Sequence, residues 1–409
     1  MINAGDTAFI LISAALVMLM TPGLALFYGG MVRRKNILAV LMQCFIILCV
    51  LSLQWVLFGY SLSFAPGAGF TGGLCWLGLN GIGAEPYAGY APTIPHQAFI
   101  IFQAMFAVIT PALIIGAFAE RIKFSAFLVF SVVWSIFVYY PVCHWVWGIG
   151  GWLRNLGVLD FAGGIVVHTT AGIAALVTTL AIGRRKNLDH NVPAPHNLPF
   201  VVLGTALLWF GWFGFNAGSA LAANGLAASA FLVTNTAASA AGLTWAILEW
   251  QRNGKPTMFG TATGAIAGLA TVTPASGFVS PLSAIIIGIL AGIFCFIGVG
   301  VVKSKFKYDD SLDAFGVHGI GGILGTLLTG LFASKAVNPA GANGLFFGNP
   351  KQFLIQLLAV SSAVAYTLIV TLIIYKLVDL FIGMRVSEKD ELIGLDLTQH
   401  RERAYTVLE

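Results

Sequence analysis

The sequence predicts an all-α polytopic membrane protein with eleven transmembrane helices, in which helices 1–5 and 6–10 form an inverted repeat and helix 11 is peripheral. The first observation behind this fold class is composition. Hydrophobic residues make up 58% of the 409 residues and charged residues only 9%, whereas soluble domains carry about 25% charged residues. The 48 glycines suit close helix packing in lipid. This composition excludes a secreted disulfide-rich domain, a disordered chain and most soluble enzymes.

The second observation is a series of apolar segments long enough to cross a bilayer, which takes about 20 mostly apolar residues. We expect eleven spans, of which the eighth is short and rich in glycine. They cover residues 6–31, 37–63, 97–119, 124–147, 160–182, 198–217, 226–250, 259–276, 281–302, 313–333 and 351–383.

The third observation is that basic residues alternate between the connections. Connections after even-numbered spans carry only Arg154, Lys335 and Lys351. Because Lys and Arg are retained in cytoplasmic loops, we expect the N-terminus outside, the C-terminus inside, and a multi-pass protein of the cytoplasmic membrane. We attribute the net charge of +5 to these loops and expect no nucleic-acid partner. The connections after odd-numbered spans carry Arg33, Arg34, Lys35, Arg121, Lys123, Arg184, Arg185, Lys186, Arg252, Lys255, Lys303, Lys305 and Lys307.

Two sequence echoes predict the inverted repeat. The pattern V-H-x-x-x-G-I begins at Val167 and again at Val317, and Thr-Pro-Ala begins at Thr110 and at Thr273. Since each half has an odd number of spans, the second half must be upside down, as in many transporters. We expect a membrane domain over 1–383, with halves of about 1–182 and 198–333 and helix 11 over about 351–383. Residues 384–409 form a polar cytoplasmic tail.

Two histidines lie within spans at matching positions of the repeat, His168 and His318. Ionisable groups within membranes are costly and mark pathways. The repeat brings both imidazoles towards the midplane, where neutral rings can each donate and accept one hydrogen bond and share a proton. A metal site is incomplete without a third ligand. We therefore expect proton handling in a pore, with no cofactor.

An aspartate opens the fifth span, Asp160, and two interpretations of it stay open: a helix N-cap, or an added negative charge that favours a cation outside His168. We expect Asp313 to be the corresponding cap on the cytoplasmic side. Of five cysteines none shows CxxC spacing, which predicts neither a zinc site nor a disulfide framework. They are Cys44, Cys49, Cys75, Cys143 and Cys295.

Aromatic residues gather at the outer ends of two spans. Those in 139–148 fit an interfacial belt, but 209–219 has rings separated by glycines beyond what a belt needs. Aromatic faces bind small cations, worth up to about 2 kcal/mol when desolvated. The Ser219 hydroxyl can accept a hydrogen bond from the same cation. Phe102 and Phe106 lie one turn apart on one helix face, and stacked phenyl rings would close the bore to hydrated ions.

These segments resemble the Amt/Mep/Rh ammonium transporters, in particular the prokaryotic Amt type. The resemblance runs from the first span into the tail. It rests on residues 27–36 (FYGGMVRRKN), 160–164 (DFAGG) with His168, 211–219 (GWFGFNAGS), 315–319 (FGVHG), and 394–396 (GLD) with His400, Ala404 and Tyr405.

The resemblance implies a homotrimer with one pore in each subunit. It implies that His168 and His318 are the family's twin histidines, that Phe106 and Phe215 form its stacked gate, and that Trp212 lines the pore. The ammonium site would comprise Trp147 and Ser219 with Phe102 and Phe106 nearby, and Asp160 would be the buried acid. The tail resembles a segment through which members bind PII-type signalling proteins.

The function expected is ammonium transport without enzymatic activity. Ammonium, with methylammonium as a candidate analogue, binds outside and is deprotonated; ammonia passes the gate while the proton crosses by the histidines. A different class remains open, an ammonium sensor that serves as the input domain of a signalling protein. A third alternative is an Rh-type channel for other neutral gases.

Overall fold

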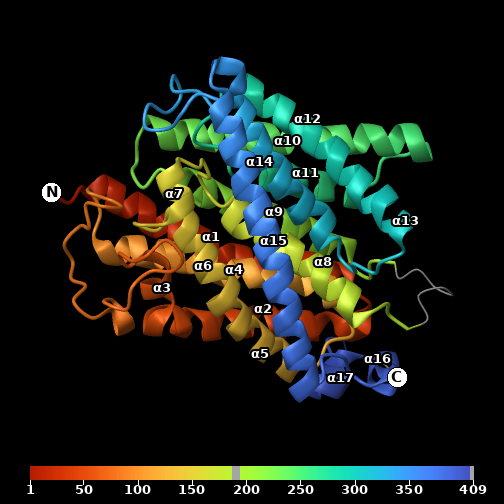
Figure 1. Cartoon of the computed structure of the whole chain (residues 1–409). Helices are drawn as coiled ribbons and strands as arrows, with labels where there is room; N and C mark the ends of the chain where they lie inside the picture. Colours follow the sequence, from red (N-terminus) through yellow and green to blue (C-terminus); the bar gives the residue numbers. More distant parts are fainter. Residues whose placement is uncertain (187–193, 406–409) are drawn as a thin grey trace.

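The computed structural model describes residues 1–186 and 194–405, which are almost wholly helical (Figure 1). The only β pairing among them is an isolated bridge between Ile122 and Arg385. The helices are α1 (Ala4–Met31), α2 (Ile37–Gln54), α3 (Tyr60–Phe64), α4 (His96–Phe118), α5 (Phe124–Trp134), α6 (Tyr140–Trp147), α7 (Trp152–Leu156), α8 (Thr170–Ile182), α9 (Leu198–Gly218), α10 (Gly225–Asn253), α11 (Met258–Val272), α12 (Pro281–Ile297), α13 (Lys303–Phe306), α14 (Ile320–Phe332), α15 (Pro350–Phe381), α16 (Glu388–Ile393) and α17 (Leu395–His400).

Ten helices or continuous helical runs of the described residues are long and apolar enough to cross a bilayer, which confirms a polytopic all-α membrane protein. The predicted eighth span corresponds to α11, which has only 15 residues. At 1.5 Å per residue it extends about 22 Å, less than the roughly 30 Å hydrocarbon core. The count of eleven therefore stays a prediction, and so does the inverted repeat.

Several of these runs contain a wide π turn, a rare winding that often marks functional sites. One run continues from α2 through η2 (Trp55–Gly59) into α3, and another from α5 through η4 (Ser135–Tyr139) into α6. A third joins α12 to α13 through η6 (Gly298–Val302). The last two, η5 (Gly164–Thr169) and η7 (Phe315–Gly319), lead directly into α8 and α14. Since they carry His168 and His318, the two histidines share one unusual backbone setting.

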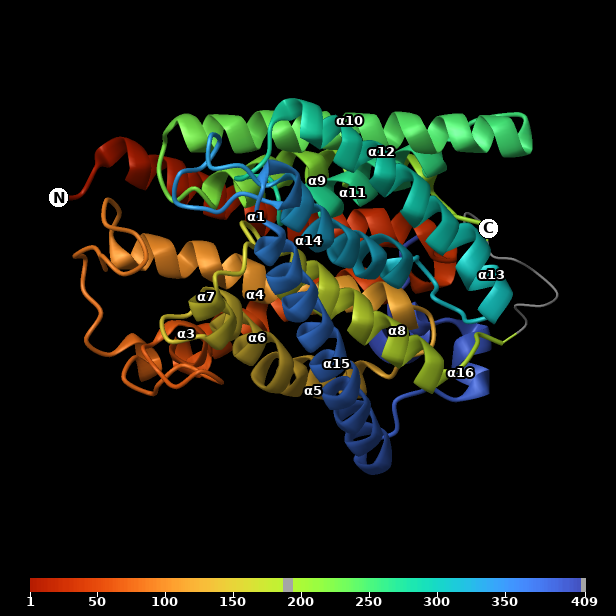
Figure 2. The same cartoon turned by 45° about the horizontal axis from the view of Figure 1, so that its top comes forward.

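Helix α4 lies at the centre of the bundle, since 94% of its most apolar 18-residue stretch is buried. Helix α1 packs along α9, and α4 packs against α1 and α8. Helix α15 crosses the front of the bundle and contacts α5, α8 and α14 (Figure 1). In Figure 2, α10 lies along the top of the bundle and α15 runs towards its bottom. The two histidines are enclosed by α1, α4, α9 and α11 together with the π turns η5 and η7.

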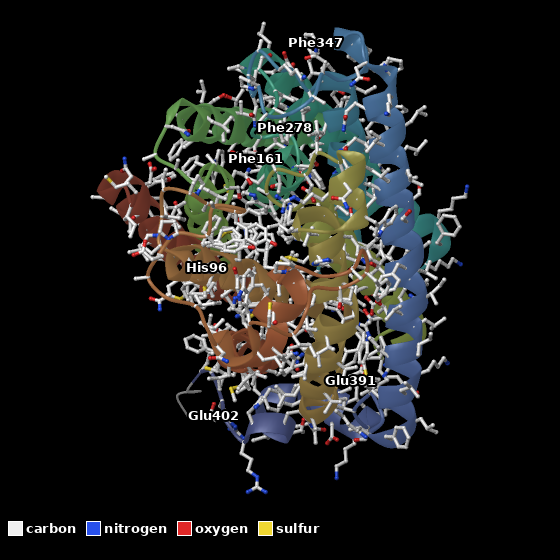
Figure 3. All side chains as sticks on the ribbon, turned by 60° about the vertical axis from the view of Figure 1, so that its left-hand side comes forward. His96, Phe161, Phe278, Phe347, Glu391 and Glu402 are labelled. Carbon is white, nitrogen blue, oxygen red and sulfur yellow. The ribbon has the colours of Figure 1, made fainter. Side chains whose placement is uncertain are left out.

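The C-terminal segment is docked on the end of the bundle that holds the α1–α2 and α4–α5 connections, called here the tail face. The Asp396 carboxylate accepts a hydrogen bond from the Ala39 N–H at the start of α2 (2.9 Å), and the Leu395 N–H donates to the Asn36 side chain (2.8 Å). In Figure 3 Glu391 and Glu402 lie at this end, opposite Phe347. The other end, which holds Phe347 and the N-terminus of α1, is called here the N-terminal face.

A buried ion cluster holds the tail face together. The Glu120 carboxylate pairs with Arg33 and Arg185, both at 2.9 Å, and Arg185 pairs with Asp309 at 2.8 Å. The fully buried Arg121 guanidinium lies 3.7 Å from Asp309. Burial alone would raise the carboxyl pKa values, but the arginines outweigh it. They lower the pKa of Glu120, and that of Asp309 to about 2.

Candidate functional site

The structure brings His168 and His318 into direct contact. Their Nδ1 atoms are 3.3 Å apart, and the rings are nearly parallel, with centroids 5.2 Å apart. Both side chains are buried, and His168 Nε2 has no hydrogen-bond partner. Because a neutral imidazole has one N–H, one Nδ1 donates while the other accepts. The pair is therefore a ready proton-sharing contact with one nitrogen left open.

A narrow apolar cavity of about 10 Å³ lies beside the pair. That volume is close to the smallest that can hold one water molecule. The Trp212 ring stacks on His168 at 5.4 Å, and its Nε1–H donates to the Thr273 hydroxyl. The cavity is lined by Met20, Leu24, Phe27, Ile109, Leu113, Val167, His168, Leu208, Trp212, Phe215, Ile266 and His318.

Two phenyl rings separate the histidines from the N-terminal face. The centroids of Phe106 on α4 and Phe215 on α9 are 4.2 Å apart, and both side chains are buried. Phe215 also stacks on His168 at 6.1 Å. The ring of Phe102 lies 4.9 Å from Phe106. The predicted gate residues are thus in contact with one another and with the histidine.

A second cavity of about 250 Å³ opens on the N-terminal face, and we call it the vestibule. Trp147, Asp160 and Ser219 all line it. The Trp147 ring meets Phe106 edge to face at 6.0 Å, whereas Phe102 and Phe106 do not themselves line the vestibule. The Ser219 hydroxyl donates to the Phe215 carbonyl (2.8 Å), so its oxygen lone pairs are free to accept from a ligand.

Sequence reasoning missed several vestibule residues. Phe161 and Phe278, near each other in Figure 3, meet edge to face at 5.5 Å. The Arg154 guanidinium donates to the Trp147 carbonyl and lies over the Tyr90 ring. Gln103 is 8% exposed, and its side-chain oxygen has no partner. A glutamine beside Phe102 in an apolar run was a detectable signal, because polar groups within spans are costly.

Asp160 is a cap of unusual completeness. Its carboxylate accepts the N–H groups of Gly163, Gly164, Ile165 and Val166 at 2.6–3.2 Å. The capping interpretation therefore agrees with the geometry. The carboxylate also borders the vestibule, so its charge can act on a cation there.

The expectation that Asp313 is the corresponding cap was wrong. Asp310 accepts the N–H groups of Ala314 and Phe315 (3.1 and 2.8 Å), at the same offset of 150 positions that relates the histidines. Asp313 has a φ of 62° and instead pairs with Lys303 at 2.6 Å. From the sequence we chose Asp313, the residue directly before the helix. In the structure the free N–H groups at the start of the π turn lie within reach of the earlier Asp310 carboxylate instead.

The cysteines and other potential ligands lie apart. All five cysteines are free thiols; Cys44, Cys143 and Cys295 are buried, and Cys49 and Cys75 are exposed. Within the described ranges, no group of three His, Cys, Asp or Glu side chains could hold a metal ion.

Comparison with known proteins places this geometry in context. The family model described as Ammonium Transporter Family matches residues 8–405. An ammonium transporter of Bacillus subtilis is 55% identical, covering 98% of both chains. Ammonium transporter Amt1 of Archaeoglobus fulgidus is 49% identical over 98% of this chain and 99% of that one.

Two solved structures are also similar. The crystal structure of Saccharomyces cerevisiae Mep2 superposes with a TM-score of 0.90 at 37% identity, covering 95% of this chain and 89% of that chain. A structure titled Sensor Amt Protein superposes with a TM-score of 0.88 at 29% identity, covering 97% and 98%.

Proposed function

The chain belongs to the ammonium transporter family, and from that premise we propose how its own residues move ammonium across a membrane. The proposal assigns the N-terminal face to the outside and the tail face to the cytoplasm, in the cytoplasmic membrane. The observation that carries it is the 3.3 Å contact between His168 and His318 behind a closed pair of phenyl rings.

Ammonium binds first in the vestibule. The Trp147 ring offers its face to the cation, and the Ser219 oxygen accepts one of its N–H groups. Phe106 and Phe102 complete the site behind Trp147, at the inner end of the vestibule. The Asp160 carboxylate adds negative charge at the edge of the vestibule, and four N–H groups hold it in place. Binding is thus mostly to rings and one hydroxyl, which also suits methylammonium.

The gate then separates ammonia from its proton. Rings 4.2 Å apart leave no room for a hydrated ion, so passage favours the neutral molecule. One N–H bond of ammonium breaks, and the open Nε2 of His168 accepts that proton. The proton on Nδ1 of His168 moves to His318 across the 3.3 Å contact, while ammonia moves through the apolar cavity beside Trp212. Potassium, which has no proton to lose, is excluded.

The test is a current measurement on purified protein in liposomes on a solid-supported membrane. A jump in ammonium should evoke a current whose decay lengthens when fewer molecules occupy each liposome, as translocation requires. A potassium jump and protein-free liposomes are the controls. A brief ammonium transient whose decay ignores protein density would contradict transport.

The second candidate function is an ammonium sensor, favoured by the similarity to Sensor Amt Protein across almost the whole chain. In that case ammonium would bind in the vestibule, and the protein would translocate little or no ammonium. The density-independent transient just described is its signature, so one experiment separates the two functions.

The assembly we propose is a homotrimer in lipid with one pore per subunit. We treat 1–383 as the membrane domain and 384–409 as a cytoplasmic tail that can dock a PII-type signalling protein. The docked tail lies beside Lys35 and Asn36 on the tail face, where such a protein would approach.

A further inference from the structure

The repeated pattern V-H-x-x-x-G-I has a glycine four residues after each histidine, and the mechanism above does not use it. These glycines are Gly172 in α8 and Gly322 in α14, both buried in helix interiors. Glycine in a helix costs about 1 kcal/mol relative to alanine. Their positions therefore need a reason beyond helix formation.

Each glycine touches the backbone that carries the other histidine. A Cβ added at Gly172 would overlap the backbone nitrogen and Cα of Gly319, and would lie 2.9 Å from the carbonyl carbon of His318. A Cβ added at Gly322 would lie 2.7 Å from the Thr169 nitrogen and 2.9 Å from the Cβ of His168. The contact is reciprocal, because α8 packs on η7 and α14 packs on η5.

We propose that Gly172 and Gly322 are positioning residues that set the separation of the two Nδ1 atoms. Each glycine provides the packing surface, called here its seat, for the helical run that carries the other histidine. The proposal rests on the proton path proposed above. A weak contact between neutral rings cannot hold two helices in register alone, since a net hydrogen bond contributes only about 0.5–1.5 kcal/mol. Closely packed backbones, in contrast, resist displacement.

The size of the effect follows from contact distances. Ordinary carbon contacts need about 3.5–4.0 Å, so one added methyl must move a helix by on the order of an ångström. At that shift the 3.3 Å Nδ1 contact is no longer a hydrogen bond. The vestibule rings Phe99 on α4 and Trp147 on α6 lie outside the crossing, so ammonium binding should be preserved.

The experiment compares Gly172→Ala and Gly322→Ala with Gly292→Ala. A Cβ at Gly292, where α12 packs on α10, would lie 2.8–3.0 Å from Thr244 and Ala241, a crowding similar to that at Gly322 and milder than that at Gly172. We expect Gly172→Ala to lower the maximal ammonium current by about 100-fold, the scale of a 1 Å misplacement, at an unchanged half-saturating concentration. Gly322→Ala should lose less, and Gly292→Ala should conduct like the wild type per folded molecule.

Equal currents in all three variants, or a half-saturation that shifts as much as the maximal current, would overturn the proposal. A wild type that conducts no ammonium would instead refute the proposed function, so the two failures differ. A crystal structure of the His168→Ala, His318→Ala variant tests the seat even where a glycine variant does not fold. The α8–η7 crossing should stay within about 0.5 Å of its position. Helices that drift once the rings are gone would show that the rings, not the glycines, set the spacing.

Discussion

The two faces of the pore handle charge in opposite ways. At the N-terminal face, the vestibule offers rings, a hydroxyl and one carboxylate already satisfied by four N–H groups. At the tail face, Glu120 and Asp309 are buried and directly paired with arginines. In the proposed function the first arrangement binds ammonium, whereas the second pairs buried charges with one another and joins the loops that carry them. In the proposed function, charge therefore serves ammonium binding at the N-terminal face and rigidity at the tail face.

The largest effect should come from the histidines that lie between the two faces. Replacing both His168 and His318 with alanine removes the open nitrogen and the relay, so proton-coupled ammonium current should be abolished. Ion leak can appear in its place. His168→Asp keeps a titratable group and should be milder than His168→Ala. Unchanged current and selectivity in the double variant would show that protons take another route.

The next effect concerns the tail face. Asp309→Asn leaves Arg121 and Arg185 without their shared carboxylate, and breaking a buried pair costs about 3–5 kcal/mol of unfolding free energy. Glu388→Gln is the matched control: its pair with Lys186 is exposed, and should cost about 0–1 kcal/mol. Thermal unfolding in detergent compares them, and equal losses would mean that the buried cluster is not a fastening.

Acid should remove the same stabilisation. The pKa of Asp309 is about 2 in the folded chain against about 3.9 for an unperturbed aspartate. Because the folded value is the lower one, the stabilisation is complete above about pH 4 and is lost as pH falls towards about 2. The stability gap between wild type and Asp309→Asn should therefore narrow over that range, and a constant gap would contradict the assignment.

A smaller effect is expected in the vestibule. Trp147→Ala or Ser219→Ala should raise the half-saturating ammonium concentration about 5- to 30-fold, equal to 1–2 kcal/mol, with the maximal current less affected. Trp145→Ala is the control, since Trp145 lies two residues away and outside the vestibule. If neither vestibule variant alters the concentration dependence, the binding site lies elsewhere.

The smallest effect on ammonium binding should come from the tail. Removing residues from Ser387 onward deletes the Asp396 cap on α2 but no membrane-spanning helix. We expect a folded trimer with an unchanged half-saturating concentration, reduced current and weaker binding of a PII-type protein. Size-exclusion chromatography with light scattering decides whether the trimer persists. Dissociation to monomers would show that the tail holds the assembly together.

The helices and the histidine pair could be predicted from sequence because both are periodic or repeated signals. Apolar runs fix the spans to within a few residues, and the 150-position echo singles out His168 and His318. The assignment of Phe106 and Phe215 to a gate and of Trp147 to the outer site came from the family resemblance, alongside aromatic residues at span ends. Each of these signals is local or is carried by a repeat.

Other features could not be predicted because they depend on long-range packing or backbone winding. Arg33 meets Glu120 across 87 positions of the chain, and Arg121 meets Asp309 across 188. The left-handed backbone at Asp313 and its pair with Lys303 leave the capping role to Asp310. Gln103 carried a signal, but its unpartnered oxygen becomes visible only when the vestibule is assembled.

The proposed pathway is built from one subunit, and this has a consequence for the genetics of pore variants. Phe106, Trp147, Phe215 and both histidines belong to a single chain, so the route that we propose uses residues of one subunit. A cell carrying one intact and one pore-dead allele would still make complete routes in every intact chain. Pore lesions should thus behave as recessive alleles, and a dominant-negative lesion would point to residues by which one copy constrains its neighbours.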